Sequence, residues 1–297
     1  MTRVVVGVDA GGTKTAAVVG DGHAILSRVE GAGGAVRPGR ALAAAAAIAD
    51  TVRRALAGAG RIRADVLVVG AAGAGREAER LELEQALRGE HVSDVVRVTT
   101  DIEIALAAAF GRKPGIVLSA GTGSIAIARA PGGALHRTGG YGWQMGDEGS
   151  GYAIGRAALA ALSRAADGRG PRTSLTARIP AAAHVASFEE LIAWAATASA
   201  AQVSSLGPTV LEVAAEGDVV AQGIVEYAAR ELCQMVRSLV EHFPPDGPIP
   251  VALAGGLLTP ERAFRSILRQ RLEEEPRLQV DEEAIQPELG ALHLAEQ

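Results

Sequence analysis

Short β-branched runs alternate with longer stretches of helical spacing along the first 110 residues. Residues 4–8, 15–19 and 23–29 read as three strands separated by glycine turns or polar residues. Helices are then predicted over 38–56, 77–87 and 102–110, with buried strands between them over 66–69 and 95–98. This order is typical of a mixed α/β lobe whose inner strands are covered on both faces.

The same pattern restarts at residue 116. Strands are predicted over 116–119, 124–128 and 134–138, followed by a largely helical stretch over 151–242, a strand over 251–254 and a helix over 260–273. Because strand, glycine turn and strand open both halves, we predict an α/β fold with a duplicated mixed-sheet core. Its N-terminal lobe spans 1–114 and its C-terminal lobe 115–284, and a last helix within 285–297 is expected to pack back on the first lobe.

Composition agrees with a two-lobed globular protein. The 297 residues are twice a domain size of about 150. A net charge of −5 without a long basic run argues against nucleic acid as a partner. Cys233, the one cysteine, excludes an intrachain disulfide and a cysteine-rich metal site. We see no signal peptide, and the apolar run 41–49 is shorter than the roughly 20 residues that cross a bilayer, so we expect a cytoplasmic protein without membrane contact.

Two glycine turns are the first candidates for chemistry. Glycines let the main chain approach a phosphate, and exposed N–H groups of a turn can hold it. Hydroxyls and an ammonium add donors, and Asp9 can hold the water shell of Mg²⁺. A pair of ordinary hairpin turns is the alternative. The predicted phosphate-binding residues are Gly11, Gly12, Thr13, Lys14 and Thr15 in the first turn, and Gly121, Thr122, Gly123 and Ser124 in the second.

Asp101 follows the strand over 95–98 and precedes a helix. Open α/β sheets bind ligands at the carboxyl ends of their strands. A carboxylate there can accept the proton of an attacking hydroxyl, as the catalytic Asp of kinases does. The alternative is that Asp101 merely caps the helix that begins at Ile102, a position that favours Asp.

Two further glycine-rich segments suggest binding. The segment 139–151 surrounds two aromatic residues and two acids with glycines, and Asp147 within it can accept hydrogen bonds from sugar hydroxyls. Its alternative is a loop whose acids cap the next helix above a packed Trp143. Gly255 and Gly256, between a strand and a helix, can let a flat base such as adenosine lie against the main chain, although a plain turn is also consistent with them.

These segments, in this order, resemble the BadF/BadG/BcrA/BcrD-type family of the actin/hexokinase/Hsp70 superfamily, in particular its N-acetylglucosamine and glucosamine kinases. The run 146–151, Gly-Asp-Glu-Gly-Ser-Gly, is the most specific part of the match, which extends from Asp9 to Gly256. The resemblance implies the two-lobed actin/hexokinase (ribonuclease H-like) fold. It also implies ATP as co-substrate, Mg²⁺, a small-molecule sugar as partner, and a homodimer as one assembly to consider.

The resemblance assigns a role to each candidate residue. Asp101 becomes the general base, the two glycine turns hold the ATP phosphates, and Gly255 and Gly256 lie at adenosine. The residues implied to contact the sugar are Asp101, Gly123, Gly139, Gly140 and Asp147.

The sequence departs from the family at two places. Relatives often carry an Asn in the loop that here reads Gly31-Ala32-Gly33-Gly34-Ala35, and their Gly-Trp-Gly is Gly140-Tyr141-Gly142 here. Both departures concern the identity of the sugar, with N-acetylmuramic acid and glucose as alternatives.

Two other activities on the same fold are alternatives. The first is an ATPase activator of a radical dehydratase. The resemblance implies that such activators supply two cysteines per chain to an iron–sulfur cluster, and this chain has only Cys233. A non-catalytic sugar sensor loses the phosphate turns or the catalytic Asp, and this chain keeps both. We therefore expect a kinase that phosphorylates the C6 hydroxyl of N-acetylglucosamine or glucosamine.

Overall fold

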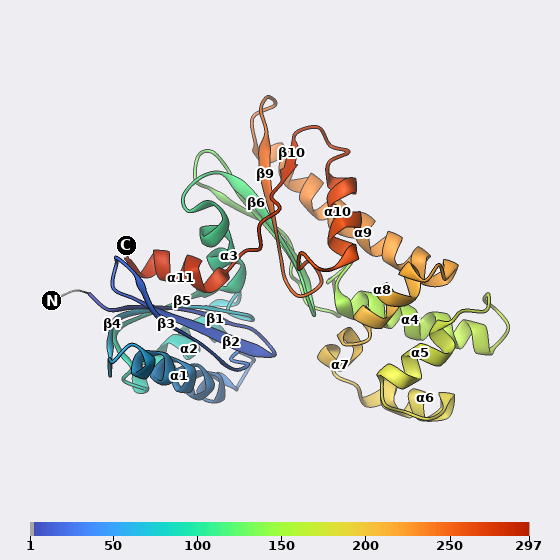
Figure 1. The fold of residues 1–297 in the computed structure, drawn as a ribbon, viewed down its shortest axis with the longest axis horizontal. Coiled ribbons are helices and arrows are strands. Elements are labelled where there is room, and N and C mark those ends of the chain that lie inside the picture. Colours follow the sequence, from blue (N-terminus) through green and yellow to red (C-terminus); the bar gives the residue numbers. More distant parts are fainter. Residues whose placement is uncertain (1–2, 297) are drawn as a thin grey trace. The chain divides into compact units, whose positions relative to one another are not determined.

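The structure, a computed structural model, describes residues 3–296 and divides into two compact units (Figure 1). Unit 1 comprises Met1–Lys113 and Ile285–Gln297, and unit 2 comprises Pro114–Ala284. The predicted lobes ended at residue 114 and at residue 284, so the first boundary differs by one residue.

Unit 1 contains one five-stranded sheet in the order β3-β2-β1-β4-β5. Strands β1, β2 and β3 are antiparallel neighbours, whereas β1, β4 and β5 run parallel. The strands are β1 (Val5–Ala10), β2 (Lys14–Gly20), β3 (Ile25–Ala32), β4 (Ala64–Ala71) and β5 (Ser93–Thr100). The helices are α1 (Ala41–Gly58), α2 (Glu77–Gly89), α3 (Asp101–Phe110) and α11 (Pro287–Glu296).

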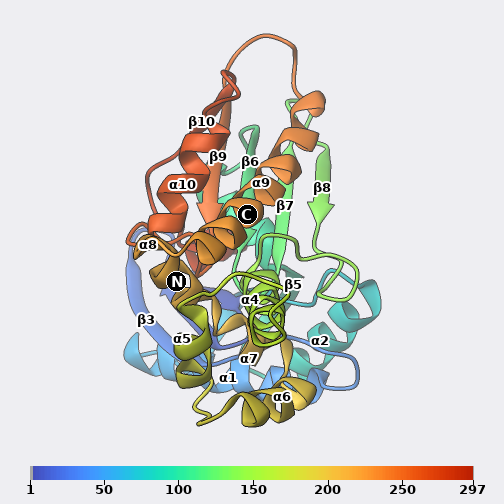
Figure 2. The same ribbon diagram turned by 90° about the vertical axis from the view of Figure 1, so that its right-hand side faces the viewer.

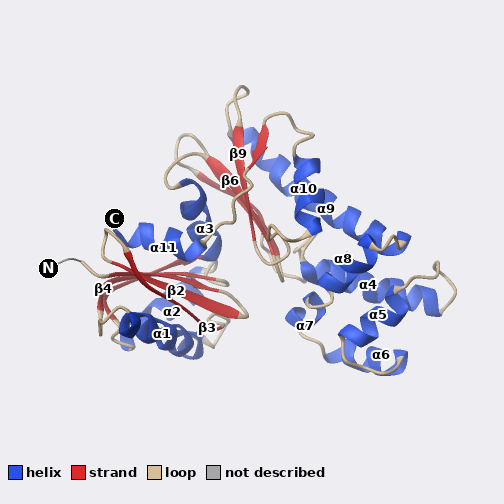
Figure 3. Ribbon diagram, viewed as in Figure 1, coloured by secondary structure: helices blue, strands red, loops and turns tan. Residues whose placement is uncertain are grey.

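Both faces of this sheet are covered by helices (Figure 3). Val6 and Val8 of β1 belong to the hydrophobic cluster that includes α1 and α2, whereas Val5 packs with α3 and α11 on the other face. Because side chains alternate along a strand, burial of both faces requires a continuous apolar run such as the one in β1.

Unit 2 repeats this strand arrangement in its sheet β10-β9-β6-β7-β8. Again three antiparallel strands come first in the chain, and a parallel neighbour lies on the other side of the first of them. The strands are β6 (Gly115–Ala120), β7 (Ser124–Arg129), β8 (Leu135–Gly139), β9 (Ile249–Ala254) and β10 (Leu278–Val280). The predicted duplicated, two-lobed α/β core is therefore confirmed.

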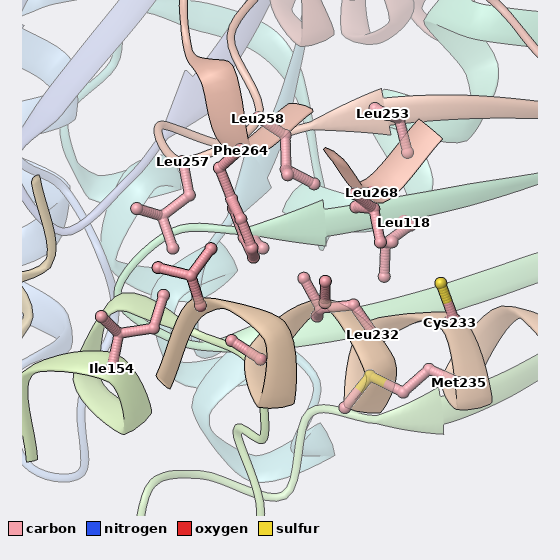
Figure 4. Packing of buried hydrophobic residues seen from close by; sticks show 14 of the residues in the cluster. Leu118, Ile154, Leu232, Cys233, Met235, Leu253, Leu257, Leu258, Phe264 and Leu268 are labelled. Carbon is pink, nitrogen blue, oxygen red and sulfur yellow. The ribbon is translucent and has the colours of Figure 1, made fainter. Parts of the chain in front are cut away.

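Most of unit 2 beyond its sheet is helical. Helix α9 lies across β6, β7 and β8 (Figure 2). Phe264 is fully buried beside Leu257 and Leu258 (Figure 4). The helices are α4 (Gly151–Ala166), α5 (Leu175–Ala182), α6 (Phe188–Thr197), α7 (Ala200–Ser204), α8 (Gly207–Ala215), α9 (Val219–Leu239), the 3₁₀ turn η1 (Val240–His242) and α10 (Ala263–Leu272). In the described part of the chain, no helix is both long and apolar enough to cross a membrane.

Two elements of unit 2 differ from the sequence prediction. Strand β10 was not predicted, because its three residues are too few to show an alternating pattern, and it forms by parallel pairing with β9. Helix α10 begins at Ala263 rather than at residue 260, since the residues from Thr259 to Arg262 form a turn.

The C-terminal helix α11 packs on the sheet of unit 1, as the sequence suggested. Two glycines allow the close approach. A Cβ atom on Gly7 of β1 would overlap the main chain at Glu288 and Leu292, and one on Gly290 would overlap the carbonyl of Ile104 in α3. Helix α11 therefore packs this closely on β1 and α3 only because a glycine, which has no side chain, stands at each contact.

We expect Gly290→Ala to lower the free energy of unfolding by about 1–3 kcal/mol, because the added methyl group forces α11 away from α3. The matched control is Gly223→Ala in α9, where a Cβ would meet nothing within 4 Å. There the greater helix propensity of Ala is expected to leave stability unchanged or raise it by up to about 1 kcal/mol. Urea unfolding of both variants checks the contrast, and equal stability would show that α11 does not depend on this contact.

Candidate active site

The first glycine turn lies where β1 meets β2. The Gly11 N–H donates to the Lys14 carbonyl at 2.9 Å, and the Gly11 carbonyl accepts from Gly34 and Ala35 at 3.1 Å each. Gly12 and Thr13 are exposed, and a Cβ on Gly12 would meet nothing within 4 Å. The main chain of the turn is thus fixed at Gly11, whereas Gly12 and Thr13 are exposed to solvent, and this arrangement suits a site for phosphate.

The two remaining residues of this turn are engaged differently. Lys14 pairs with Glu30 of β3 at 2.8 Å, and both side chains are exposed. Such a surface pair contributes at most about 1 kcal/mol, so the ammonium can exchange partners at little cost. The Thr15 hydroxyl is fully buried without a hydrogen-bond partner in the described residues and points toward Gly34. It lies beneath the turn and is not among the donors that the turn offers to a ligand.

Asp101 lies at the start of α3, but Thr100 is the residue that caps this helix. The Thr100 hydroxyl accepts from the Glu103 N–H at 3.2 Å, and the Glu103 carboxylate accepts from the Thr100 N–H at 3.1 Å. This reciprocal capping box satisfies two free N–H groups at the helix start. The alternative reading, in which Asp101 serves as the cap, is therefore wrong.

The environment of Asp101 favours a carboxyl that can take up a proton. Burial raises its pKa, the main-chain N–H groups of Ile102 and of Asp101 itself lower it, and Glu103 raises it, with a net increase. Asp9, at the end of β1, shows the same trend more strongly. Burial, followed by the negative charges of Asp101 and Glu288, raises the pKa of Asp9 to about 7, against a lowering by Lys14.

Two other carboxylates, those of Asp101 and Glu288, thus act on Asp9. Among the described residues no group of three or more side chains is arranged to chelate a metal ion. Mg²⁺ commonly uses only one or two carboxylates and takes its other ligands from water and phosphate. Asp9 fits that role, because a nearby cation would offset both the burial and the repulsion from Asp101 and Glu288 that raise its pKa.

The second glycine turn, between β6 and β7, is held by the start of α4. The Gly121 N–H donates to the Gly123 carbonyl at 2.9 Å. The Gly151 N–H donates to the Gly121 carbonyl at 2.8 Å, and the Tyr152 N–H donates to the Thr122 carbonyl at 3.3 Å. Thr122 is exposed. This turn, like the first, has its carbonyls fixed by a neighbouring segment of main chain.

Asp147 packs directly against this turn. Its Oδ1 accepts from the Ser124 N–H at 3.2 Å, and a Cβ on Gly123 would lie 2.8 Å from the same oxygen. Asp147 has a φ of 63° and is buried, and burial followed by the charge of Glu148 raises its pKa, although the Ser124 N–H lowers it. Two of the predicted sugar contacts, Gly123 and Asp147, therefore lie side by side.

Other residues of the segment 139–151 have distinct roles. Gly139 and Gly140 have φ values of 74° and 72°, and the Gly140 N–H donates to the Ser124 carbonyl at 3.0 Å. Ser150, not an acid, caps α4 by accepting from the Ala153 N–H at 3.2 Å. Trp143 is 49% exposed and lies 5.3 Å from the Tyr152 ring, so it does not pack beneath the loop.

The Ser124 side chain is turned into the protein. It is buried, and its hydroxyl donates to the Glu148 carbonyl at 2.7 Å. This bond ties the second glycine turn to the segment 139–151. Of the predicted phosphate-binding hydroxyls, those of Thr13 and Thr122 remain on exposed residues.

Gly255 and Gly256 lie against the second glycine turn within unit 2. Gly255 has a φ of 90°, and a Cβ there would overlap the Ala120 main chain. The same Ala120 carbonyl accepts from the Leu257 N–H at 3.1 Å. The predicted phosphate and adenosine segments of unit 2 are therefore adjacent.

The loop that lacks the family's Asn packs tightly beside the first glycine turn. A Cβ on Gly33 would overlap the Gly12 carbonyl, and one on Gly34 would lie 2.5 Å from Ile48. A side chain at either position requires the loop to move. Glycine is therefore the residue that fits at both positions in this structure.

Sequence reasoning missed two residues of this region. Glu103 could have been found from the Thr-x-x-Glu spacing at 100–103, which is the signature of a capping box. Arg265, on α10, bonds to carbonyls at both ends of the Gly255–Gly256 turn, and no pattern in the sequence indicates this.

The chain is similar to known proteins over its whole length. It is 36% identical over 177 residues to an N-acetylmuramic acid/N-acetylglucosamine kinase of Clostridium acetobutylicum, spanning 59% of this chain and 58% of that protein. It is 28% identical over 313 residues to an N-acetyl-D-glucosamine kinase of Dictyostelium discoideum, covering 99% and 98% of the two chains.

Solved structures agree with this result. A candidate N-acetylglucosamine kinase from Chromobacterium violaceum superposes with a TM-score of 0.84 at 29% identity over 99% of both chains. An ROK hexokinase from Thermus thermophilus, at 20% identity and a TM-score of 0.60 over 99% of both chains, shares the fold. The profile of one family matches residues 6–295. The chain therefore belongs to the BadF/BadG/BcrA/BcrD ATPase family.

Proposed function

We propose that the protein transfers the γ-phosphate of MgATP to a sugar hydroxyl, with the C6 hydroxyl of N-acetylglucosamine or glucosamine as acceptor. The observation that carries this proposal is the state of Asp101. It lies at the carboxyl edge of the sheet in unit 1. Since Thr100 is the helix cap, the Asp101 carboxylate keeps acceptor capacity for a substrate hydroxyl beyond its interaction with the main-chain N–H groups of Ile102 and Asp101.

In this mechanism the oxygen of the sugar hydroxyl attacks the γ-phosphorus, ADP leaves, and Asp101 accepts the proton of that hydroxyl. The raised pKa of Asp101 brings its basicity closer to that needed at neutral pH. Main-chain N–H groups of the two glycine turns hold the phosphates, and Asp9 would hold Mg²⁺ through water. The metal, when bound, neutralises charge on the triphosphate.

Asp147 and Gly123 support the sugar assignment. Among the described residues the buried Asp147 carboxylate receives one hydrogen bond, from the Ser124 N–H, so it keeps acceptor capacity for hydroxyls. The names of the Clostridium and Dictyostelium relatives favour an N-acetylated amino sugar. The dimer, the cytoplasmic location and the requirement for Mg²⁺ remain parts of this proposal.

The position of Cys233 argues against the alternative function, an ATPase activator of a radical dehydratase. Cys233 is buried in α9, and burial raises the pKa of its thiol to about 11. A protonated thiol inside the core is a poor ligand for an iron–sulfur cluster.

N-acetylmuramic acid remains the second candidate substrate, since the Clostridium relative is named for both sugars. The segment 139–151 carries no basic residue that could pair with the lactyl carboxylate. The guanidinium of Arg137, however, lies 5.1 Å from the Tyr141 ring centroid, so one cation lies beside the segment.

Asp101→Asn is expected to retain the fold and ATP binding while kcat falls by roughly 10²–10⁴, the usual contribution of a general base. The matched control is Asp94→Asn at the other end of β5, where the exposed carboxylate pairs with Arg63. Steady-state kinetics and thermal unfolding of both variants test this expectation. Near-normal turnover by a stable Asp101→Asn protein would remove Asp101 from the mechanism.

Asp147→Asn is expected to raise KM for the sugar about tenfold with little change in KM for ATP, because it loses a charged acceptor for hydroxyls. Asn tolerates the positive φ at this position, so the loop is retained. Glu148→Gln, at an exposed neighbour, serves as control. A parallel rise in both KM values would indicate a loop defect instead.

Among free sugars, kcat/KM is expected to be highest for N-acetylglucosamine or glucosamine. Glucose should be distinctly poorer, since each lost hydrogen bond typically costs about 2- to 12-fold. A coupled assay for ADP over a panel that includes N-acetylmuramic acid measures this order. First place for glucose or N-acetylmuramic acid would contradict the assignment to N-acetylglucosamine or glucosamine and leave the kinase chemistry standing.

A further inference from the structure

Arg265 is a charged residue inside unit 2 that the proposed chemistry does not use. It lies in α10 next to the fully buried Phe264 in sequence and is itself only 6% exposed. All five hydrogen bonds that its terminal nitrogens make to described residues end on main-chain carbonyls. A buried guanidinium with such acceptors needs a structural or functional reason.

The acceptors fall into two groups. Nη1 donates to Leu253 at 3.3 Å and to Leu258 at 2.8 Å, the residues on either side of the Gly255–Gly256 turn. Nη2 donates to three successive carbonyls, those of Asp281 at 2.9 Å, Glu282 at 3.1 Å and Glu283 at 3.3 Å. One planar group therefore joins the turn to the segment 281–283.

The segment 281–283 is the last part of unit 2 before the chain continues into unit 1. Unit 2 ends at Ala284, and Ile285 belongs to unit 1. On the far side of this boundary, Arg28 of β3 donates to the side chain of Gln286 at 2.8 Å and pairs with the buried Glu288. Arginines therefore hold the chain on both sides of Ala284 and Ile285.

We propose that Arg265 is a positioning residue that makes the Gly255–Gly256 turn and the segment 281–283 move as one body. This inference rests on the proposed function, which places adenosine at Gly255 and Gly256. The chain connects the units at Lys113–Pro114 and at Ala284–Ile285, and nucleotide bound at the turn then restrains the second of these connections. Only a forked guanidinium can serve both groups of carbonyls, because a lysine ammonium is a single point charge.

The test compares Arg265→Lys with Arg271→Lys. Arg271 lies on the same helix, is more exposed, and pairs with Glu226 of α9, away from the turn. Dissociation constants for ADP and for N-acetylglucosamine are measured by calorimetry on each full-length variant. We expect Arg265→Lys to weaken ADP binding about tenfold, the loss of one or two hydrogen bonds at the turn, with sugar binding changed less than twofold. Arg271→Lys should change neither.

Hydrogen exchange of the unaltered protein gives an independent measurement that requires no variant to fold. ADP should slow exchange of amides both in 253–258 and in 281–286, and in Arg265→Lys only the first segment should respond. Protection of 253–258 alone in the unaltered protein would overturn the coupling. Unchanged ADP affinity, or equal loss of ADP and sugar affinity with a lower Tm, would overturn the positioning role.

Failure of the proposed function gives a different result. If the unaltered protein neither bound ADP nor phosphorylated any sugar in the panel, the kinase assignment would fail first. If the unaltered protein bound ADP and phosphorylated a sugar, and Arg265→Lys bound ADP equally well, only the role of Arg265 would be contradicted.

Discussion

Both units depend on places where two stretches of main chain approach more closely than a Cβ atom permits. Gly33 lies against the Gly12 carbonyl in unit 1, and Gly255 lies against Ala120 in unit 2. These approaches let neighbouring N–H groups reach the carbonyls of the turns, which fixes the turns without using their outer faces. Glycine packing therefore contributes to the rigidity of both turns, and in unit 2 the side chains of Ser124 and Asp147 add hydrogen bonds to it.

The sequence predicted the architecture well because its strongest signals are physical requirements of this fold. Strand β1 must be apolar on both faces, and the glycine turns that open the two halves have no helical alternative. Helix α3 was predicted within one residue, because a polar Thr-Asp pair precedes a run that is apolar apart from Glu103. The duplicated order of strands followed from these local signals alone.

The details of the site were less predictable, because they depend on contacts between distant residues. A hydroxyl next to glycine looks like a ligand donor in sequence, yet Thr15 is buried under Gly34 and Ser124 is bonded to Glu148. The segment between α10 and α11 shows no periodicity, since its order comes from Arg265 and from pairing with β9. Such long-range effects leave no local pattern to read.

The position of Trp143 gives the molecule an intrinsic optical reporter. The chain has two tryptophans, and Trp194 lies in α6, partly buried against the hydrophobic cluster of unit 2. Trp143 is half exposed beside Tyr152, four residues before Asp147. Its indole emission depends on its contact with water, so a ligand that orders this segment should change the emission spectrum, whereas Trp194 supplies a nearly constant background.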